Sequence, residues 1–149
     1  MRERMLKPLL LVMCAAATAG MQSAPKGDIN VTITDLRSTE GVVRACLTRD
    51  RDTFPRCDKD PHARHLIVDA GGDLALRFTG VEPGAYAIAV LHDENDNGKA
   101  DRVLGMMPKE GFGFSRDARV RMGPPKYEDA VFDFGGTEAN LTIRMRYML

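Results

Sequence analysis

The sequence lacks the residue patterns that mark the common classes of enzyme active site. It has no Gly-x-Ser-x-Gly elbow, no His-Glu-x-x-His pair and no glycine-rich loop that would hold a phosphate. A serine hydrolase of the elbow type, a zinc protease and a P-loop nucleotide site are therefore not predicted. The chemistry must be sought in less common arrangements of polar side chains.

The chain also lacks an excess of charge of either sign, with 21 basic and 21 acidic residues. The signal peptide predicted below contains three basic residues and one acidic residue, so its removal would leave a net charge near −2. Binding to nucleic acid depends on clustered Lys and Arg side chains that contact phosphates. Neither nucleic acid nor an anionic membrane surface is predicted as a partner from this balance.

Long hydrophobic runs are absent after the N-terminus, so no integral membrane segment is expected in the mature chain. Residues 9–19 form an uncharged apolar run that follows a basic stretch, which is typical of a signal peptide. The run is about half the ~20 residues of a membrane-spanning helix. We predict a signal peptide over residues 1–19 and a periplasmic or secreted protein. Cleavage after Ala24 and a lipid anchor on Cys14 are the alternatives.

Two cysteines, Cys46 and Cys57, remain once the signal peptide is removed. In an oxidising compartment such a pair predicts a disulfide, and two unpaired buried thiols are the alternative. Closing this loop would stabilise the fold by somewhat less than ~3 kcal/mol. The remaining 130 or so residues are about the size of one domain, which we place at residues 28–149.

Apolar and polar residues alternate with a period of two through most of the mature chain, which predicts β-strands rather than helices. Glycine pairs at 71–72 and 135–136 predict hairpin turns. About seven such strands favour an all-β fold of two packed antiparallel sheets, a β-sandwich. The alternating segments lie within residues 29–34, 42–48, 66–68, 74–79, 85–91, 132–134 and 141–147.

A long stretch at residues 105–129 interrupts this pattern with several glycines and prolines and is predicted to be a loop without regular structure. Its large apolar residues either cap an open end of the sandwich or line a groove for a ligand. These residues are Met106, Met107, Phe112, Phe114 and Tyr127.

An acidic loop directly after the 85–91 segment carries oxygen-bearing residues at every second position. It matches the first, third, fifth, seventh and ninth places of a calcium loop, with Gly98 in the sixth. The predicted ligands are Asp93, Asn95, Asn97, the carbonyl group of Lys99, and Asp101. Calcium is therefore the candidate cofactor, because oxygen donors suit zinc and copper poorly.

The match is incomplete, because Leu104 occupies the twelfth place, where a calcium loop has a bidentate glutamate. A further carboxylate would have to come from elsewhere, with Glu110, Glu128 and Asp129 as candidates. Without it, the dissociation constant is expected near ~10⁻⁴–10⁻³ M. The alternative is a turn that binds no metal, since the Asn97-Gly98 pair favours a type I′ turn.

The histidines offer weaker sites. His62 and His65 precede a strand on opposite faces, so a transition-metal site is not favoured. His92 adjoins Asp93, so a His-Asp general base is conceivable, although a strand-end histidine bonded to the backbone or to a carboxylate is the simpler interpretation. Paired carboxylates for sugar hydrolysis would come from Glu94, Asp96, Glu110, Glu128 and Asp129.

Several short motifs together resemble a bacterial exported family known as domain of unknown function 2141, from Ile29 to the C-terminus. The resemblance implies an Ig-like or prealbumin-like β-sandwich with no assigned activity, and the two cysteines are not part of the family pattern. The motifs are Gly80-Val81-Glu82-Pro83-Gly84-Ala85-Tyr86, Leu91-His92-Asp93 with the acidic loop, Pro108-Lys109-Glu110-Gly111-Phe112-Gly113-Phe114-Ser115, Gly123-Pro124-Pro125 and Glu128-Asp129-Ala130.

Three functions are compatible with these patterns. The first is a non-enzymatic module that binds a protein, small-molecule or glycan ligand through the 105–129 stretch, with the acidic loop as a calcium-dependent clasp. The second is a small hydrolase that uses His92 with Asp93 or a carboxylate pair. The third is a structural accessory domain of the cell envelope.

Overall fold

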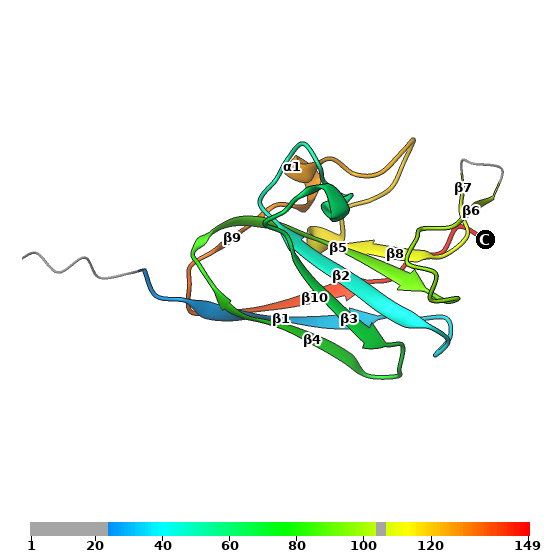
Figure 1. Cartoon of the computed structure of the whole chain (residues 1–149), viewed down its shortest axis with the longest axis horizontal. Coiled ribbons are helices and arrows are strands. Elements are labelled where there is room, and N and C mark those ends of the chain that lie inside the picture. The colour runs from blue at the N-terminus through cyan, green and yellow to red at the C-terminus, as the bar shows by residue number, and fades with distance from the viewer. Residues whose placement is uncertain (1–23, 104–106) are drawn as a thin grey trace, which may run out of the picture.

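The computed structural model describes residues 24–103 and 107–149 (Figure 1). The signal peptide predicted over residues 1–19, with Cys14, lies outside the described residues, and so does Leu104. No helix within the described ranges is long and apolar enough to cross a membrane.

The described residues form two main sheets and a small two-stranded one. One main sheet has the order β10-β1-β4 and the other the order β3-β2-β5-β8, with β9 also paired to β5; β6 pairs with β7. The strands are β1 (Gly27–Thr34), β2 (Val42–Thr48), β3 (Arg64–Asp69), β4 (Leu74–Val81), β5 (Gly84–Asp93), β6 (Arg102–Val103), β7 (Met107–Pro108), β8 (Gly111–Phe114), β9 (Phe132–Phe134) and β10 (Glu138–Arg144). The helices are η1 (Cys57–Lys59), η2 (Ser115–Asp117) and α1 (Tyr127–Ala130).

The main core lies between the two sheets, as the alternation predicts. Apolar residues at every second position of the strands point inward because successive side chains of a strand leave on opposite faces. The β-sandwich is therefore confirmed. The core includes Ile29, Val31 and Ile33 of β1, Val43, Ala45 and Leu47 of β2, Leu76 and Phe78 of β4, Tyr86, Ile88 and Val90 of β5, and Ile143 of β10.

The connections between strands differ from the predicted hairpins. The turn at Gly71-Gly72 leads from β3 to β4, but β3 pairs with β2 and β4 pairs with β1, so the turn joins the two sheets. The turn at Gly135-Gly136 likewise leads from β9, beside β5, to β10. β10 runs parallel to β1, whereas the other pairs are antiparallel. Each turn therefore carries the chain from one layer of the sandwich to the other.

The 105–129 stretch is more regular than predicted, since its described part contains β7, β8, η2 and the start of α1. Phe114 and Tyr127 pack edge-on against Phe54, each with ring centroids 5.9 Å apart. They cover the outer face of the larger sheet at the small side chain of Ala87. We call this cluster of Phe54, Ala87, Phe114, Ala118, Tyr127 and Ala130 the aromatic cover.

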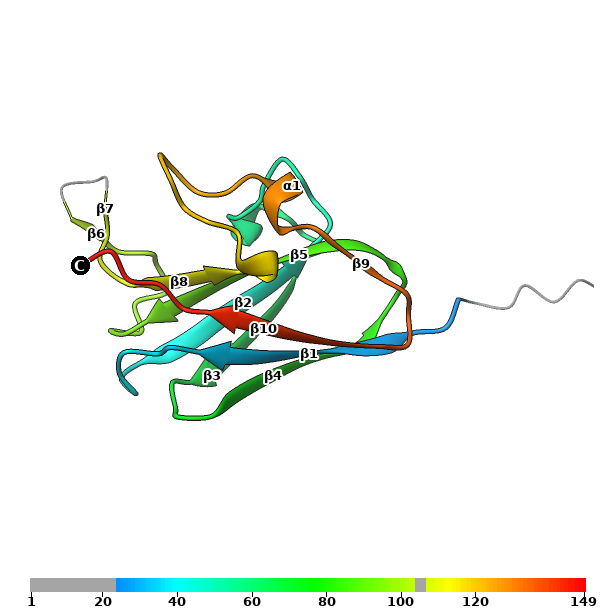
Figure 2. The same cartoon turned by 180° about the vertical axis from the view of Figure 1, so that it is seen from behind.

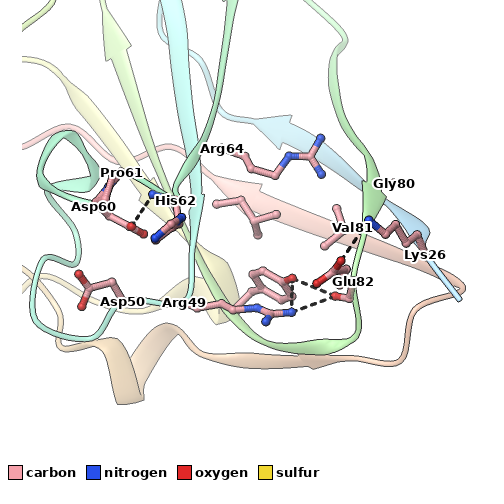
Figure 3. A pocket seen from close by; sticks show the side chains of 12 residues that line it. Lys26, Arg49, Asp50, Asp60, Pro61, His62, Arg64, Gly80, Val81 and Glu82 are labelled. Carbon is pink, nitrogen blue, oxygen red and sulfur yellow. Dashed lines mark hydrogen bonds and ion pairs between the residues drawn. The ribbon is translucent and has the colours of Figure 1, made fainter. Parts of the chain in front are cut away.

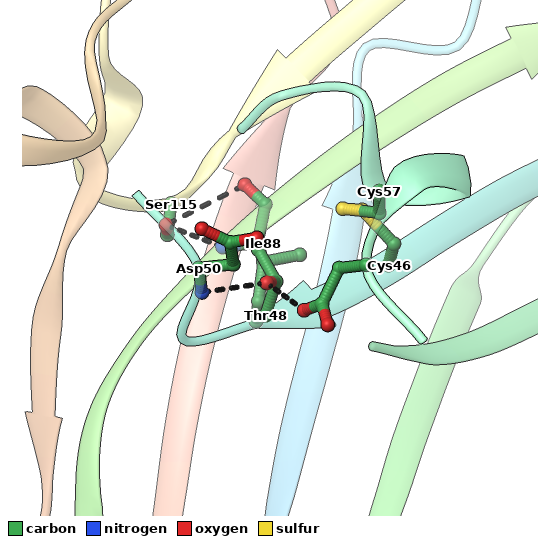
Figure 4. Close-up of a disulfide and its surroundings, with 7 residues drawn as sticks. Cys46, Thr48, Asp50, Cys57, Ile88 and Ser115 are labelled. Carbon is green, nitrogen blue, oxygen red and sulfur yellow. Dashed lines mark hydrogen bonds between the residues drawn. A yellow bond between two sulfur atoms is a disulfide. The ribbon is translucent and has the colours of Figure 1, made fainter. Parts of the chain in front are cut away.

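A disulfide ties the β2–β3 connection to the same face of the sheet (Figure 4). The predicted bond between Cys46 and Cys57 is confirmed, with the two Cα atoms 6.2 Å apart. Ser115 is fully buried beneath the cover: its hydroxyl donates to the carbonyl oxygen of Ala130 at 2.6 Å and accepts the amide of Ile88 at 2.9 Å. The covalent bond and this hydroxyl fix two long connections over β5.

Candidate functional site

The acidic loop begins at the last residue of β5, where the strand leaves the sheet. Asp93 is fully buried, and its carboxylate accepts hydrogen bonds from Arg44 Nε at 2.6 Å and from the amides of Gly98 at 2.8 Å and Asn97 at 3.0 Å. Burial alone would raise the pKa of Asp93, but these three donors outweigh it and hold the pKa below its ordinary value. The Asp93 side chain is therefore ionised, and its bonds to the two backbone amides fix the shape of the loop.

The other predicted ligands converge on one carboxylate. Asp101 accepts the side-chain amides of Asn95 at 2.8 Å and of Asn97 at 3.0 Å. The Lys99 amide donates to Asn97 Oδ1 at 2.8 Å. The Asn95 Oδ1 atom accepts the backbone amide of Asn97 at 3.3 Å, so both side chains direct their nitrogens, and not their oxygens, toward Asp101. The loop thus brings together Asn95, Asn97 and Asp101.

Glu110 lies beside this cluster and was one of three candidates for the missing carboxylate. Its side chain is 3% exposed, and Oε2 accepts the backbone amide of Asp101 at 3.1 Å. Burial raises the pKa of Glu110, and the negative charges of Asp93 and Asp101 add to this effect. The other two candidates lie elsewhere, because Glu128 pairs with Arg51 and Asp129 caps α1.

The acidic side chains around the loop differ in whether they have a basic partner. Arg44 is paired with both Asp93 and Asp96, each at 2.6 Å. Asp101 and Glu110, in contrast, have no Lys or Arg partner within salt-bridge distance among the described residues. No three Asp, Glu, His or Cys side chains there are arranged as a ready metal site. A cation at this place would have to combine the two carboxylates with amide and carbonyl oxygens, as calcium does.

His92 is fully buried next to the loop and both of its ring nitrogens have partners. Nε2 lies 2.8 Å from the carbonyl oxygen of Glu40, which can only accept, so Nε2 carries the hydrogen. Nδ1 then accepts from the hydroxyl of Tyr147 at 2.7 Å. The Asp93 carboxylate binds Arg44 and the backbone amides instead of the His92 ring. The geometry therefore supports a structural role for His92.

Tyr147 and Glu94 extend this network through Arg37. The Arg37 guanidinium lies 4.5 Å from the Tyr147 ring centroid and binds both oxygens of Glu94. These hydrogen bonds, together with one from Ser38, lower the pKa of Glu94 to about 2. We call the network of Arg37, Arg44, His92, Asp93, Glu94 and Tyr147 the polar end.

Sequence reasoning missed Arg37, Arg44 and Tyr147 as members of this site. Each lies about 50 residues or more from its partner along the chain. No local spacing reports such a contact. The register of the strands explains the contact between Arg44 and Asp93. Arg44 stands opposite Leu91 of β5, and Asp93 is the next residue on the same face of that strand.

A hollow of about 800 Å³ lies at the other end of the strands, where the edge strands β3 and β4 of the two sheets diverge (Figure 3). On its rim, Lys26 forms an ion pair with Glu82 at 3.0 Å, and Arg49 donates to the Pro83 carbonyl at 2.8 Å. The hollow is lined by Lys26, Leu47, Arg49, Asp50, Asp60, Pro61, His62, Arg64, Gly80, Val81, Glu82 and Tyr86. The hydroxyl of Tyr86 in this lining is bonded to Arg49 and to the Glu82 carbonyl oxygen.

The chain matches the model of a protein family. The model of the family described as an uncharacterized protein conserved in bacteria (DUF2141) matches residues 31–142, and the chain therefore belongs to that family. No curated protein and no solved structure matches the chain.

Proposed function

We propose that this DUF2141 member is an exported, non-catalytic binding module whose 93–101 loop holds a calcium ion as a clasp. Export rests on the N-terminal sequence pattern. The absence of catalysis is inferred from His92, whose ring nitrogens both serve structural hydrogen bonds. The ligand of the module is a protein, a small molecule or a glycan.

One observation carries the calcium proposal. The buried Glu110 carboxylate accepts the backbone amide of Asp101, and neither acid has an ion-pair partner among the described residues. A cation there would replace the bonds that Asn95 and Asn97 donate to Asp101, and both side chains would turn their amide oxygens to it. Burial raises the pKa of Glu110, and the charges of Asp93 and Asp101 raise it further, against the opposing effect of backbone hydrogen bonds. A divalent cation bound by these oxygens would remove that unfavourable charge.

The test is thermal unfolding with and without calcium. With a dissociation constant of about 1 mM, 10 mM calcium would stabilise the fold by about 1.4 kcal/mol. For a domain of this size we expect the melting temperature to rise by about 4–6 °C. Asp101→Asn and Glu110→Gln keep the side-chain size, remove one negative charge each and should abolish most of the rise.

The matched control is Asp73→Asn, which removes the same charge from the exposed turn between β3 and β4. It should leave the calcium response unchanged. Equal shifts with calcium, magnesium and sodium at the same ionic strength would reveal only charge screening. Either that result or the absence of any shift in the wild type would refute calcium binding.

A further inference from the structure

The loop between η2 and α1, residues 118–126, collects positive charge on an otherwise balanced chain. Its cations are Arg119, Arg121 and Lys126, and none of them forms an ion pair with another described residue. They surround a hollow of about 620 Å³ whose single acid is Asp129. The Asp129 carboxylate already accepts the backbone amide of Lys126 at 3.1 Å. Three cations against one acid leave an excess of positive charge around the hollow.

Met122 stands among these cations and is 104% exposed, as open to solvent as in an extended chain. It is the most exposed of the large apolar side chains in the part of the chain that the structure describes, the next being Ile67 at 57% and Leu149 at 56%. It follows Arg121 directly, and Arg119 lies three residues before it. An apolar tip flanked by basic side chains is the arrangement found in segments that rest in the interface of a membrane.

The base of the loop is firmly attached to the sandwich. Arg146 of the segment after β10 donates to both carboxylate oxygens of Asp117, at 2.7 and 2.6 Å. Ser115 joins η2 to the Ala130 carbonyl of α1 at 2.6 Å. Pro124 and Pro125 restrict the backbone conformation of the segment that leads back to α1. The charges are thus displayed at a fixed position rather than on a free tail.

The loop projects from the same side of the molecule as the short β6–β7 sheet (Figures 1 and 2). That sheet also exposes apolar side chains, with Val103 37% and Met107 44% exposed. Arg102 precedes Val103, so an apolar residue and a cation again stand together. A flat surface placed on this side would meet both projections.

We propose that the 118–126 loop docks the protein on an anionic phospholipid surface. The three cations would approach the lipid phosphates, and Met122 would enter the headgroup layer. Each Lys or Arg near such a surface strengthens binding by about fivefold. The total charge of the chain gives no reason to expect this partner, because acids elsewhere on the surface balance the cations of the loop.

The experiment is sedimentation of the purified protein with vesicles, in EDTA so that any calcium effect is removed. Vesicles of phosphatidylethanolamine with 30% phosphatidylglycerol are compared with neutral phosphatidylcholine vesicles. We expect binding to the anionic vesicles only, falling steeply with added salt. Arg119→Gln/Arg121→Gln should weaken binding on the order of 25-fold, at about fivefold per cation. Met122→Ser should weaken it on the order of tenfold.

A matched control is Arg64→Gln/Arg144→Gln, which removes the same charge from β3 and β10. It should bind as the wild type does, and thermal melting verifies that every variant is folded. No wild-type binding to anionic vesicles, or equal losses in the control, would overturn the proposal. Equal binding to heparin that is insensitive to Met122→Ser would also overturn it and point to a soluble polyanion.

Discussion

The polar end and the aromatic cover hold long connections to the same sheet by opposite means. At the polar end, Asp93 and Glu94 are held by arginines and backbone amides. Over the outer face of β5, rings of Phe54, Phe114 and Tyr127 pack together beside a disulfide. The first arrangement depends on ionisation, and the second does not. Stability at the two places should therefore respond to different conditions.

The largest effect is expected from Asp93→Ala. The change leaves the Arg44 guanidinium and the amides of Asn97 and Gly98 without their shared acceptor. Breaking a buried charge pair costs about 3–5 kcal/mol of unfolding free energy. Because Arg44 is partly exposed and keeps Asp96, we expect the lower end, about 3 kcal/mol, measured by urea denaturation. Asp96→Ala removes the exposed partner of the same arginine and should cost less than about 1 kcal/mol. Similar losses in both variants would show that burial of Asp93 is not what matters.

The disulfide comes next. Replacing Cys46 and Cys57 together with alanine should lower the unfolding free energy by about 2–3 kcal/mol, since the closed loop spans 11 residues. Because no ionisable group is involved, the loss should be the same at pH 4 and pH 7. A loss that varied strongly with pH would erase the distinction between the two regions.

The smallest effect, and the one that depends on pH, is expected for Glu94→Gln. The folded pKa of Glu94 is lowered to about 2 from the ordinary value of 4.5. Its stabilisation is therefore complete above about pH 4.5 and is lost as the pH falls toward about 2. At pH 7 the variant should be less stable by about 1 kcal/mol, since the Arg37 side chain is partly exposed.

The pH series supplies the control for that variant. The difference between wild type and Glu94→Gln should shrink between pH 4.5 and pH 2.5, when unfolding is followed at constant ionic strength. A difference that stayed constant over this range would mean that Glu94 acts through its shape and not through its charge.

Alternation of residue types was sufficient to predict the sandwich and its inward faces. On β5, the large Tyr86, Ile88 and Val90 face the main core, whereas the small Ala87 faces the aromatic cover. The sequence shows this difference in size directly, because strand side chains alternate. The disulfide was also predictable, because its two cysteines lie only 11 residues apart in the chain.

Strand order and the partners of the acidic loop were not predictable. Two glycine turns look like hairpin turns in sequence, yet each carries the chain between sheets. The identity of Arg44 as the partner of Asp93 depends on the register of β2 against β5. A shift of one residue would send Arg44 to the core face. Such contacts are fixed by the packing of the whole sandwich and not by local spacing.

The parallel pairing of β1 with β10 has a consequence for the order of folding. Asp28 stands beside Glu138, so the first described strand finds its neighbour 110 residues later. Closing so large a loop delays the contact, and proteins rich in distant pairings fold slowly. The smaller sheet must wait for the last strand to be synthesised. Until then β1 keeps one open edge, which leaves a row of backbone groups free to pair with another chain.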